Sequence, residues 1–345
     1  MVIRLSAIGD IVMASPLVAA LRRQYPQAYI AWLAQPESRE LLVGHPQLDE
    51  VIVWPRSEWR QLLTDRRYLE LARRVRAFRR ELREHGFDLA IDLQGLMKSG
   101  WLAWLSGAPE RVGLGSREGS RWLMTHVVER GGRAELIGSE YRFLAEALEL
   151  PVADFHMQVG IGTEAERVAG VLLETHVGQR SFAVGCPFTT RPQKHWVEQA
   201  WADLARELYA RHGLPLVLLG GPGDLAAARR IAAQAGDAVD NRVGETSLTE
   251  AAAVISRARL LVGVDTGLTH MGPAFNVPTV ALFGSTCPYL ETGRDNTVVI
   301  YHNLPCAPCK RNPTCEGRFD CLTGITVEEV LAQVERLLPH QEAST

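Results

Sequence analysis

Short apolar runs alternate with longer amphipathic segments along most of the chain. In the first half these runs predict strands at residues 2–5, 29–33, 51–53, 89–93 and 111–113. In the second half they recur at residues 182–185, 216–219, 260–263 and 279–283. Such alternation is typical of parallel sheets flanked by helices, so the pattern predicts an α/β fold.

The segments between the runs have helical spacing of apolar residues. The clearest is the basic segment over residues 66–85, whose apolar face comprises Leu69, Ala72, Val75, Phe78 and Leu82. We expect this face to be buried against a sheet. Further helices are predicted over residues 164–174 and 327–338.

The chain has 345 residues, which is more than a single hydrophobic core usually supports. We therefore expect two domains, over residues 1–158 and 159–325, with a cleft between them. The closing helix, within residues 326–340, is a candidate to pack back on the first domain. The repeated alternation predicts a parallel sheet in each domain.

Hydrophobic residues make up 46% of the chain and charged residues 22%, as in ordinary globular proteins. The net charge of −3 argues against generic nucleic-acid binding. Ten arginines nevertheless lie between residues 56 and 83, which indicates an acidic partner for the first domain. The sequence shows neither an apolar run of about 20 residues nor a signal peptide, so a cytoplasmic location is expected.

The first polar motif, Arg4-Leu-Ser-Ala-Ile-Gly-Asp10, follows the first predicted strand. In open α/β sheets this turn borders the ligand crevice. Asp10 is a suitable helix N-cap and equally a suitable general base for an attacking hydroxyl, and its position alone leaves both roles open.

A second motif, Val264-Asp-Thr-Gly-Leu-Thr-His-Met-Gly-Pro273, follows another predicted strand and opens a helix. Free amide groups, hydroxyls and a helix N-terminus suit a diphosphate. The expected contacts are Asp265, Thr266, Gly267, Leu268, Thr269 and His270. For His270, packing is the alternative to phosphate contact.

Two further sets of loops are expected at the same edge of the sheet in the second domain. Thr189, Thr190 and Lys194 are candidates for the same phosphates, with a surface turn as the alternative. The loops at 220–224 and 244–248, with Asp224 and Thr246, are candidates for adenine and ribose. Neither loop is a P-loop, because no Gly-Lys-Ser/Thr follows.

Together these motifs, with residues 92–99 and a terminal cysteine cluster, make the chain resemble glycosyltransferase family nine, the ADP-heptose:lipopolysaccharide heptosyltransferases. The resemblance covers nearly the whole chain. It implies a GT-B architecture of two Rossmann-like domains facing a cleft, inversion at the anomeric carbon, Asp10 as base and ADP-L-glycero-β-D-manno-heptose as donor in the second domain. It implies no tightly bound cofactor.

Within the family, Trp59-Arg60, residues 92–99 and Arg117 resemble heptosyltransferase I, which adds heptose to Kdo on lipid A. One departure is Gly221-Pro-Gly-Asp224, where similar enzymes often carry a ribose-binding glutamate. The acceptor implied is an anionic lipopolysaccharide precursor at the cytoplasmic face of the inner membrane. The candidate acceptor residues are Arg56, Arg60, Gln94, Lys98, Arg117 and Arg121. The basic segment over residues 66–83 is either a solvated face or a contact with an anionic membrane.

Four of the six cysteines are Cys306, Cys309, Cys315 and Cys321. Four thiolates can close a structural zinc site, but the second Cys-x-x-Cys pair of a zinc ribbon is missing, so a metal is not favoured. Three alternatives to heptosyltransferase I remain at this stage. They are heptosyltransferase II or another family-nine transferase that adds to a heptose, a sugar-nucleotide epimerase or hydrolase, and a nucleotide sensor without activity.

Overall fold

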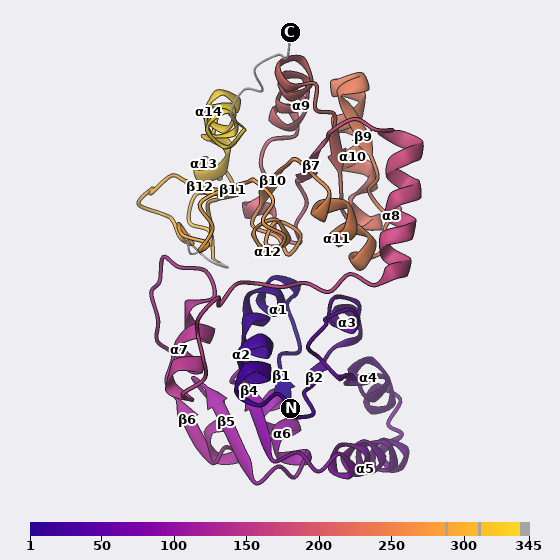
Figure 1. Cartoon of the computed structure of the whole chain (residues 1–345), viewed down its shortest axis with the longest axis vertical. Coiled ribbons are helices and arrows are strands. Elements are labelled where there is room, and N and C mark those ends of the chain that lie inside the picture. The colour runs from indigo at the N-terminus through magenta and orange to yellow at the C-terminus, as the bar shows by residue number, and fades with distance from the viewer. Residues whose placement is uncertain (287–288, 310–311, 339–345) are drawn as a thin grey trace. The chain divides into compact units, whose positions relative to one another are not determined.

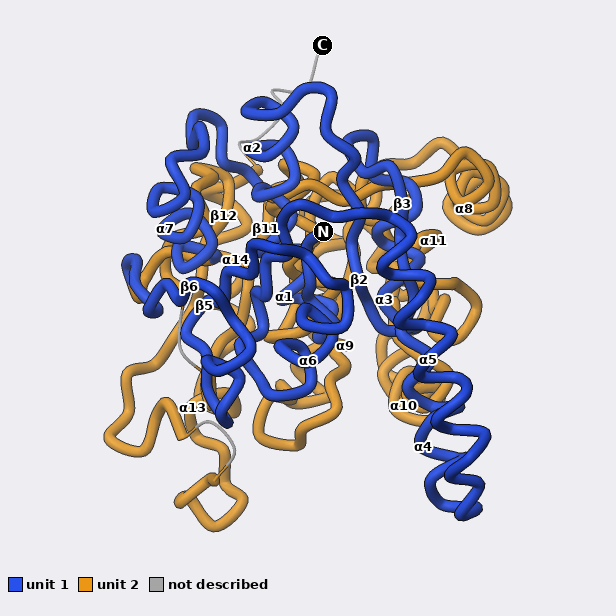
Figure 2. The backbone as a smooth tube through the Cα atoms, turned by 90° about the horizontal axis from the view of Figure 1, so that it is seen from below, with its two compact units in different colours: residues 1–133, 138–156 blue, residues 134–137, 157–345 orange. Residues whose placement is uncertain are grey.

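The computed structural model describes residues 1–286, 289–309 and 312–338. It divides into two compact units (Figures 1 and 2). Unit 1 comprises residues 1–133 and 138–156, and unit 2 comprises residues 134–137 and 157–345. Residues 134–137 belong to unit 2, where Leu136 forms a β-bridge with Glu291. Beside this bridge the Ile137 amide donates a hydrogen bond of 2.9 Å to the Glu291 carbonyl.

Unit 1 contains a six-stranded parallel sheet in the order β3-β2-β1-β4-β5-β6. Its strands are β1 (Val2–Ile3), β2 (Ala31–Ala34), β3 (Glu50–Val53), β4 (Leu89–Asp92), β5 (Glu110–Leu114) and β6 (His126–Val128). Its helices are α1 (Ile8–Ala14), α2 (Pro16–Gln24), α3 (Pro36–Val43), α4 (Arg56–Thr64), α5 (Tyr68–Glu84), α6 (Met97–Leu105) and α7 (Ser139–Ala147).

Unit 2 repeats this topology, with a six-stranded parallel sheet in the order β12-β11-β10-β7-β8-β9. Its strands are β7 (Ala183–Cys186), β8 (Leu216–Leu218), β9 (Val239–Asn241), β10 (Leu260–Val264), β11 (Thr279–Phe283) and β12 (Thr297–Tyr301). Its helices are α8 (Thr163–His176), α9 (Glu198–His212), α10 (Leu225–Ala235), α11 (Leu248–Ser256), α12 (Met271–Ala274), α13 (Asp320–Thr323) and α14 (Val327–Leu337).

Both sheets have the strand order of a Rossmann fold, 3-2-1-4-5-6 when each unit is counted from its own first strand. The sequence pattern did not predict β6, β9 and β12, and all three are edge strands. The closing helix α14 packs on α9 and β11, so it is part of unit 2 as far as residue 337, while residues 339 and 340 lie outside the described residues.

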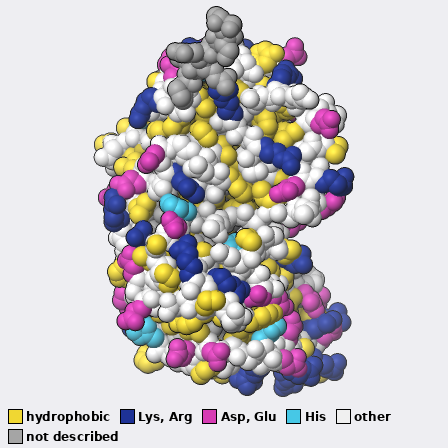
Figure 3. All heavy atoms as spheres, viewed as in Figure 1, with side chains coloured by type: hydrophobic (Ala, Val, Ile, Leu, Met, Phe, Trp, Pro, Cys, Tyr) yellow, Lys and Arg dark blue, Asp and Glu magenta, His cyan; other side chains and the backbone are white. Residues whose placement is uncertain are grey.

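Helix α5 corresponds to the predicted basic helix, and Phe78 and Leu82 are buried as expected. The prediction for Leu69 is wrong, because 79% of this residue is exposed. Lys and Arg side chains gather over α5, at the lower right of Figure 3. No helix in the part of the chain that the structure describes has the length and apolarity to cross a bilayer.

Candidate functional site

The predicted motifs lie at the point in each sheet where the strand order reverses. In unit 1 this point is between β1 and β4, which lead into residues 4–10 and 93–99. In unit 2 it is between β7 and β10, which lead into residues 187–194 and 265–270. Ligands of open α/β sheets bind outside the carboxyl ends of the strands at this point, so each unit presents one candidate site.

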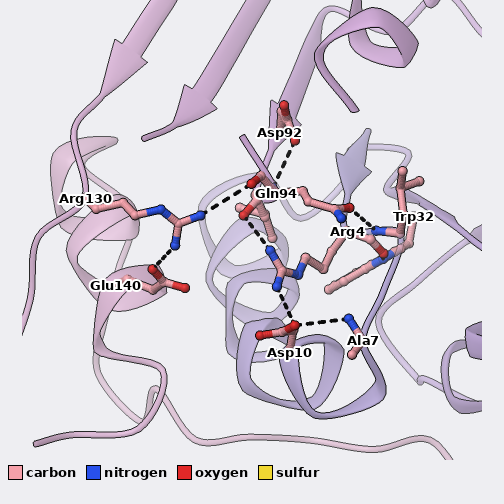
Figure 4. A network of polar contacts seen from close by, with 10 residues as sticks. Arg4, Ala7, Asp10, Trp32, Asp92, Gln94, Arg130 and Glu140 are labelled. Carbon is pink, nitrogen blue, oxygen red and sulfur yellow. Dashed lines mark hydrogen bonds and ion pairs between the residues drawn. The ribbon is translucent and has the colours of Figure 1, made fainter. Parts of the chain in front are cut away.

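Asp10 lies in the first turn of α1, where its Oδ2 atom has two partners (Figure 4). The Ala7 amide donates to Oδ2 at 3.1 Å, and the Arg4 guanidinium pairs with it at 2.6 Å. The N-cap position considered for Asp10 from the sequence is therefore occupied by Ala7, and Asp10, three residues further on, accepts from the amide of that N-cap residue. The other oxygen, Oδ1, has no hydrogen-bond partner among the described residues, so it is available to accept a proton.

Arg4, which holds Asp10, was not identified as a site residue from the sequence. It is only 8% exposed, and its Nη1 atom donates to the Leu93 carbonyl at 3.1 Å. The signal in the sequence was an arginine directly after an apolar strand. An arginine in such a place is expected to be buried, and a buried charge needs a partner. Arg4 thus links the turns that follow β1 and β4.

The turn after β4 is built around Asp92, which is fully buried. Asp92 accepts hydrogen bonds from the amides of Gln94 and Gly95 and from the Ser99 hydroxyl. Gly95 is required here, because a Cβ atom would lie 2.4 Å from the Leu114 carbonyl oxygen. Burial raises the pKa of Asp92, although these hydrogen bonds oppose it.

Gln94, a predicted acceptor contact, is 8% exposed, and its side-chain oxygen accepts from the Leu5 amide at 3.2 Å. In this structure the side-chain oxygen of Gln94 is therefore hydrogen-bonded to the protein backbone.

The predicted basic acceptor residues are distributed over several elements of unit 1. Arg56 and Arg60 line a cavity of about 410 Å³ between α3 and α4, together with Gln35 and Glu37. Burial lowers the pKa of Lys98, at the start of α6, and the positive charge of Arg56 lowers it further. Arg117 is exposed, and Arg121 is exposed and paired with Glu129.

In unit 2 the candidate site is centred on Asp265. Lys194 Nζ lies 2.5 Å from Asp265 Oδ2 and donates to the Asp265 carbonyl at 3.1 Å. His270 Nε2 lies 3.4 Å from Oδ1, and the Thr286 hydroxyl donates to Oδ2 at 2.6 Å. Burial acts to raise the pKa of Asp265, but His270 and Lys194 outweigh it and hold this pKa below its usual range.

Lys194 is thus already paired with a carboxylate in this structure. Its ammonium group has three N–H donors, and two of them are directed to Asp265. One donor remains for a ligand. The pairing with Asp265 and the contribution of Thr286 were not predicted, because they join residues far apart in the sequence.

The turn over residues 265–270 differs from the expected phosphate cradle in two ways. The Thr269 hydroxyl is buried and donates to the Val264 carbonyl at 2.6 Å, and a Cβ atom on Gly263 would lie 2.1 Å from that hydroxyl. Thr269 therefore stabilises the turn. The helix that follows, α12, has only four residues.

The amides of Gly267, Leu268 and His270 nevertheless have no backbone acceptor among the described residues. Thr266, Gly267 and Leu268 are half-buried, so this part of the turn remains accessible to a ligand.

The remaining predicted donor residues lie around the same sheet edge. Thr189 is half-buried and Thr190 exposed, and their hydroxyls have no partner in the described part of the chain. The Gly244 amide donates to the Gly220 carbonyl at 3.0 Å, which joins the two loops that carry Thr246 and Asp224. Asp224 Oδ2 accepts from the Gly221 amide at 2.9 Å, so one of its oxygens caps its own loop.

The four C-terminal cysteines are free thiols in the structure. Cys315 and Cys321 are buried, whereas Cys306 and Cys309 are half-buried. Within residues 1–286, 289–309 and 312–338, no group of three or more His, Cys, Asp or Glu side chains is placed to hold a metal ion.

Comparison with known proteins agrees with this arrangement. The chain is 29% identical to lipopolysaccharide heptosyltransferase 1 of Pseudomonas aeruginosa, over 98% of this chain and 97% of the relative. It is 28% identical to lipopolysaccharide heptosyltransferase 2 of Escherichia coli, over 99% of both. The solved structure of E. coli ADP-heptose lps heptosyltransferase II superposes with a TM-score of 0.76 and 27% identity, over 97% of each chain.

The fold is accordingly the GT-B fold, with two Rossmann-like units. The sequence pattern of the family described as "Glycosyltransferase family 9 (heptosyltransferase)" matches residues 75–319. This span includes the turns after β4, β7 and β10 but not Asp10. The chain therefore belongs to glycosyltransferase family 9, and it is a glycosyltransferase.

Proposed function

We propose that this enzyme transfers L-glycero-D-manno-heptose from ADP-heptose to the Kdo of the lipopolysaccharide inner core. The names of its relatives support heptose as the transferred sugar and lipopolysaccharide as the product. The superposed E. coli enzyme is named for ADP-heptose, which supports an ADP-linked donor. The observation that carries the proposal is the Asp10 carboxylate, held by Arg4 at the switch point of unit 1 with one oxygen open.

In this proposal Asp10 acts as general base. The acceptor hydroxyl attacks the anomeric carbon of the donor, its proton passes to Asp10 Oδ1, and the bond from that carbon to the diphosphate breaks. The carbon is attacked from the side opposite the leaving group, so its configuration inverts and no covalent enzyme intermediate forms.

Unit 2 holds the donor in this proposal. The open amides of Gly267, Leu268 and His270 and the remaining Lys194 donor bind the diphosphate, and they stabilise the charge that develops as ADP leaves. Thr189, Thr190 and Thr266 supply hydroxyls, and the joined loops with Asp224 and Thr246 contact the nucleoside. Thr269 acts indirectly, by holding the turn.

Unit 1 holds the acceptor. Arg56 and Arg60 in the cavity beside α3, with Lys98 nearby, match the carboxylates and phosphates of a Kdo-bearing lipid. Trp59 is buried next to Arg60, and this pair resembles heptosyltransferase I. Heptosyltransferase II activity is the second candidate, favoured by a nearly equal identity to such an enzyme.

The test is incubation with ADP-heptose and, in parallel, Kdo-lipid A or Kdo-lipid A that already carries one heptose. Mass spectrometry should show one added heptose on the first acceptor only, and NMR should show inversion at the anomeric carbon. Addition to the second acceptor alone identifies heptosyltransferase II. Consumption of ADP-heptose without acceptor, and no transfer, contradicts both candidates and indicates a hydrolase or epimerase.

A further inference from the structure

We propose that one flank of α5 binds the surface of an anionic lipid bilayer. This flank, called the α5 stripe, consists of Leu69, Arg73, Arg76, Arg80 and Arg83. The proposal deepens the proposed function, since it names the surface by which the enzyme reaches a lipid-anchored acceptor. It is separate from the acceptor cavity, because the α5 stripe shares no residue with that cavity.

The spacing of the stripe places its members on one side of the helix. Residues 69, 73, 76, 80 and 83 follow steps of four and three, which keep side chains on one face of an α-helix. By the same spacing the buried Phe78 and Leu82 lie opposite the stripe, and the acidic Glu70 and Glu81 lie on one side of the helix between the two, about 100° from the stripe. Helix α5 therefore has a buried face, a basic flank and a mixed flank.

Ion pairs occur mainly on the mixed flank. Arg67 pairs with Glu70, and Arg74 pairs with Glu58 at 3.0 Å. Arg73, Arg76 and Arg83 have no ion pair among the described residues, and Arg80 has only an exposed pair with Glu84 at 3.9 Å. The stripe thus carries positive charge that the protein itself does not neutralise.

Aromatic and apolar groups border this charge. The Arg79 guanidinium lies 5.6 Å from the ring centre of Trp104 in α6, and 42% of Trp104 is exposed. At the other end of α5, Leu69 is exposed and follows Tyr68, which is 58% exposed, and Leu63 near the end of α4 is 55% exposed. Indole rings favour the bilayer interface, and exposed apolar side chains next to arginines are typical of helices that lie on it.

Charge complementarity favours a bilayer over other partners. Residues 56–84 contain ten arginines and five acids, whereas the whole chain has a net charge of −3. An anionic surface therefore attracts this region and repels much of the rest, which orients the enzyme. Nucleic acid would use the arginines but would leave Leu69, Tyr68 and Leu63 unexplained.

The experiment compares two double variants of the full-length protein that remove the same charge, one from within α5 and one from α5 and the residue that precedes it. Arg73→Gln/Arg76→Gln alters the α5 stripe, and Arg67→Gln/Arg74→Gln alters the mixed flank. Binding to vesicles of phosphatidylglycerol and phosphatidylethanolamine is measured by sedimentation, without donor or acceptor. Circular dichroism and thermal unfolding establish that each variant is folded.

Each arginine close to an anionic bilayer strengthens binding about fivefold, so the stripe variant should bind about 25-fold more weakly than wild type. The mixed-flank variant should lose far less of its affinity for the vesicles. Trp104→Ala should weaken vesicle binding while its dependence on salt stays as in wild type, because the indole carries no charge. Wild type should not bind neutral phosphatidylcholine vesicles.

An equal loss in both double variants, or no loss in either, overturns the proposal. Binding of wild type to a DNA duplex as tightly as to the anionic vesicles also overturns it, in favour of a nucleic-acid surface. Because no substrate is present, a failure of heptosyl transfer leaves this result unaffected, and the two proposals can fail independently.

Discussion

Asp10 in unit 1 and Asp265 in unit 2 both follow a central strand of a parallel sheet. The Asp10 side chain is 35% exposed, with one oxygen bound to Arg4 and Ala7 and the other open. The Asp265 side chain is 13% exposed and is surrounded by Lys194, His270 and Thr286. Asp10 follows the first strand of its unit and Asp265 the fourth strand of its own, so the same residue type at the two switch points is suited to different tasks.

The exposure and the partners of each aspartate determine what its turn can contribute to a reaction. A carboxylate with an open oxygen and a single cation can take a proton from a substrate hydroxyl. A buried carboxylate with three partners keeps its proton-free form and fixes the groups around it. We therefore propose that the turn of unit 1 carries the chemistry and that the turn of unit 2 positions the donor.

The largest effect is expected for Asp10→Asn, which keeps the shape of the side chain and removes the base. Because general-base catalysis contributes about 10²- to 10⁴-fold, kcat should fall by about that factor. Binding of ADP-heptose, measured by calorimetry, should remain as in wild type. Full turnover in this variant would exclude Asp10 from the mechanism.

Asp265→Asn should act chiefly on stability. The change leaves the half-buried Lys194 and the buried His270 beside a neutral amide, and breaking a largely buried ion pair in this way costs about 3 kcal/mol. Urea unfolding measures the loss. Asp224→Asn is the matched control in the same unit, and its loss should be about 1 kcal/mol or less, since Asp224 caps an accessible loop. Equal losses would contradict the role given to Asp265.

Arg4→Met should show that Asp10 depends on its partner. Without the guanidinium the Asp10 carboxylate loses the contact that orients it, and we expect kcat to fall about tenfold, which is about 1.4 kcal/mol in the barrier. The KM for ADP-heptose should not change, and Arg4→Lys should recover part of the rate. A rise in KM without a change in kcat would indicate that Arg4 serves only binding.

The smallest effect concerns pH. The pKa of Asp265 is lower in the folded protein than in the unfolded chain, so its stabilisation is complete above about pH 5 and is lost as the pH falls further. At pH 3 the loss should be about 1 kcal/mol. The difference in unfolding free energy between wild type and Asp265→Asn should therefore shrink by that amount between pH 6 and pH 3. A constant difference would contradict the pairing.

The sequence predicts the strands that are buried on both faces more readily than those at the edges. Strands such as β10 and β11 are apolar runs, because helices cover both sides of the sheet. Strand β9, Val239–Asn241, has three residues, two of them polar, and lies at an edge. Short edge strands need less apolar surface, so their pattern is weak.

The candidate site shows a similar division. Asp10, Lys194 and Asp265 stand in recognisable turns, so they could be selected from the sequence. Their partners could not be, because Lys194 and Asp265 are 71 residues apart and Arg4 meets the Leu93 carbonyl across 89 residues. For Thr269 the sequence could not show that its hydroxyl donates to the Val264 carbonyl, since a hydroxyl next to a strand end can serve the chain or a ligand equally well.

The pairing of Leu136 with Glu291 determines how the protein can be divided. Because residues 134–137 belong to unit 2, the polypeptide passes from one unit to the other three times, after residues 133, 137 and 156. A cleavage after residue 156 would therefore yield neither unit intact. The N-terminal fragment would carry a segment of its neighbour, and the C-terminal fragment would have Glu291 without its bridge, so the halves are best expressed together.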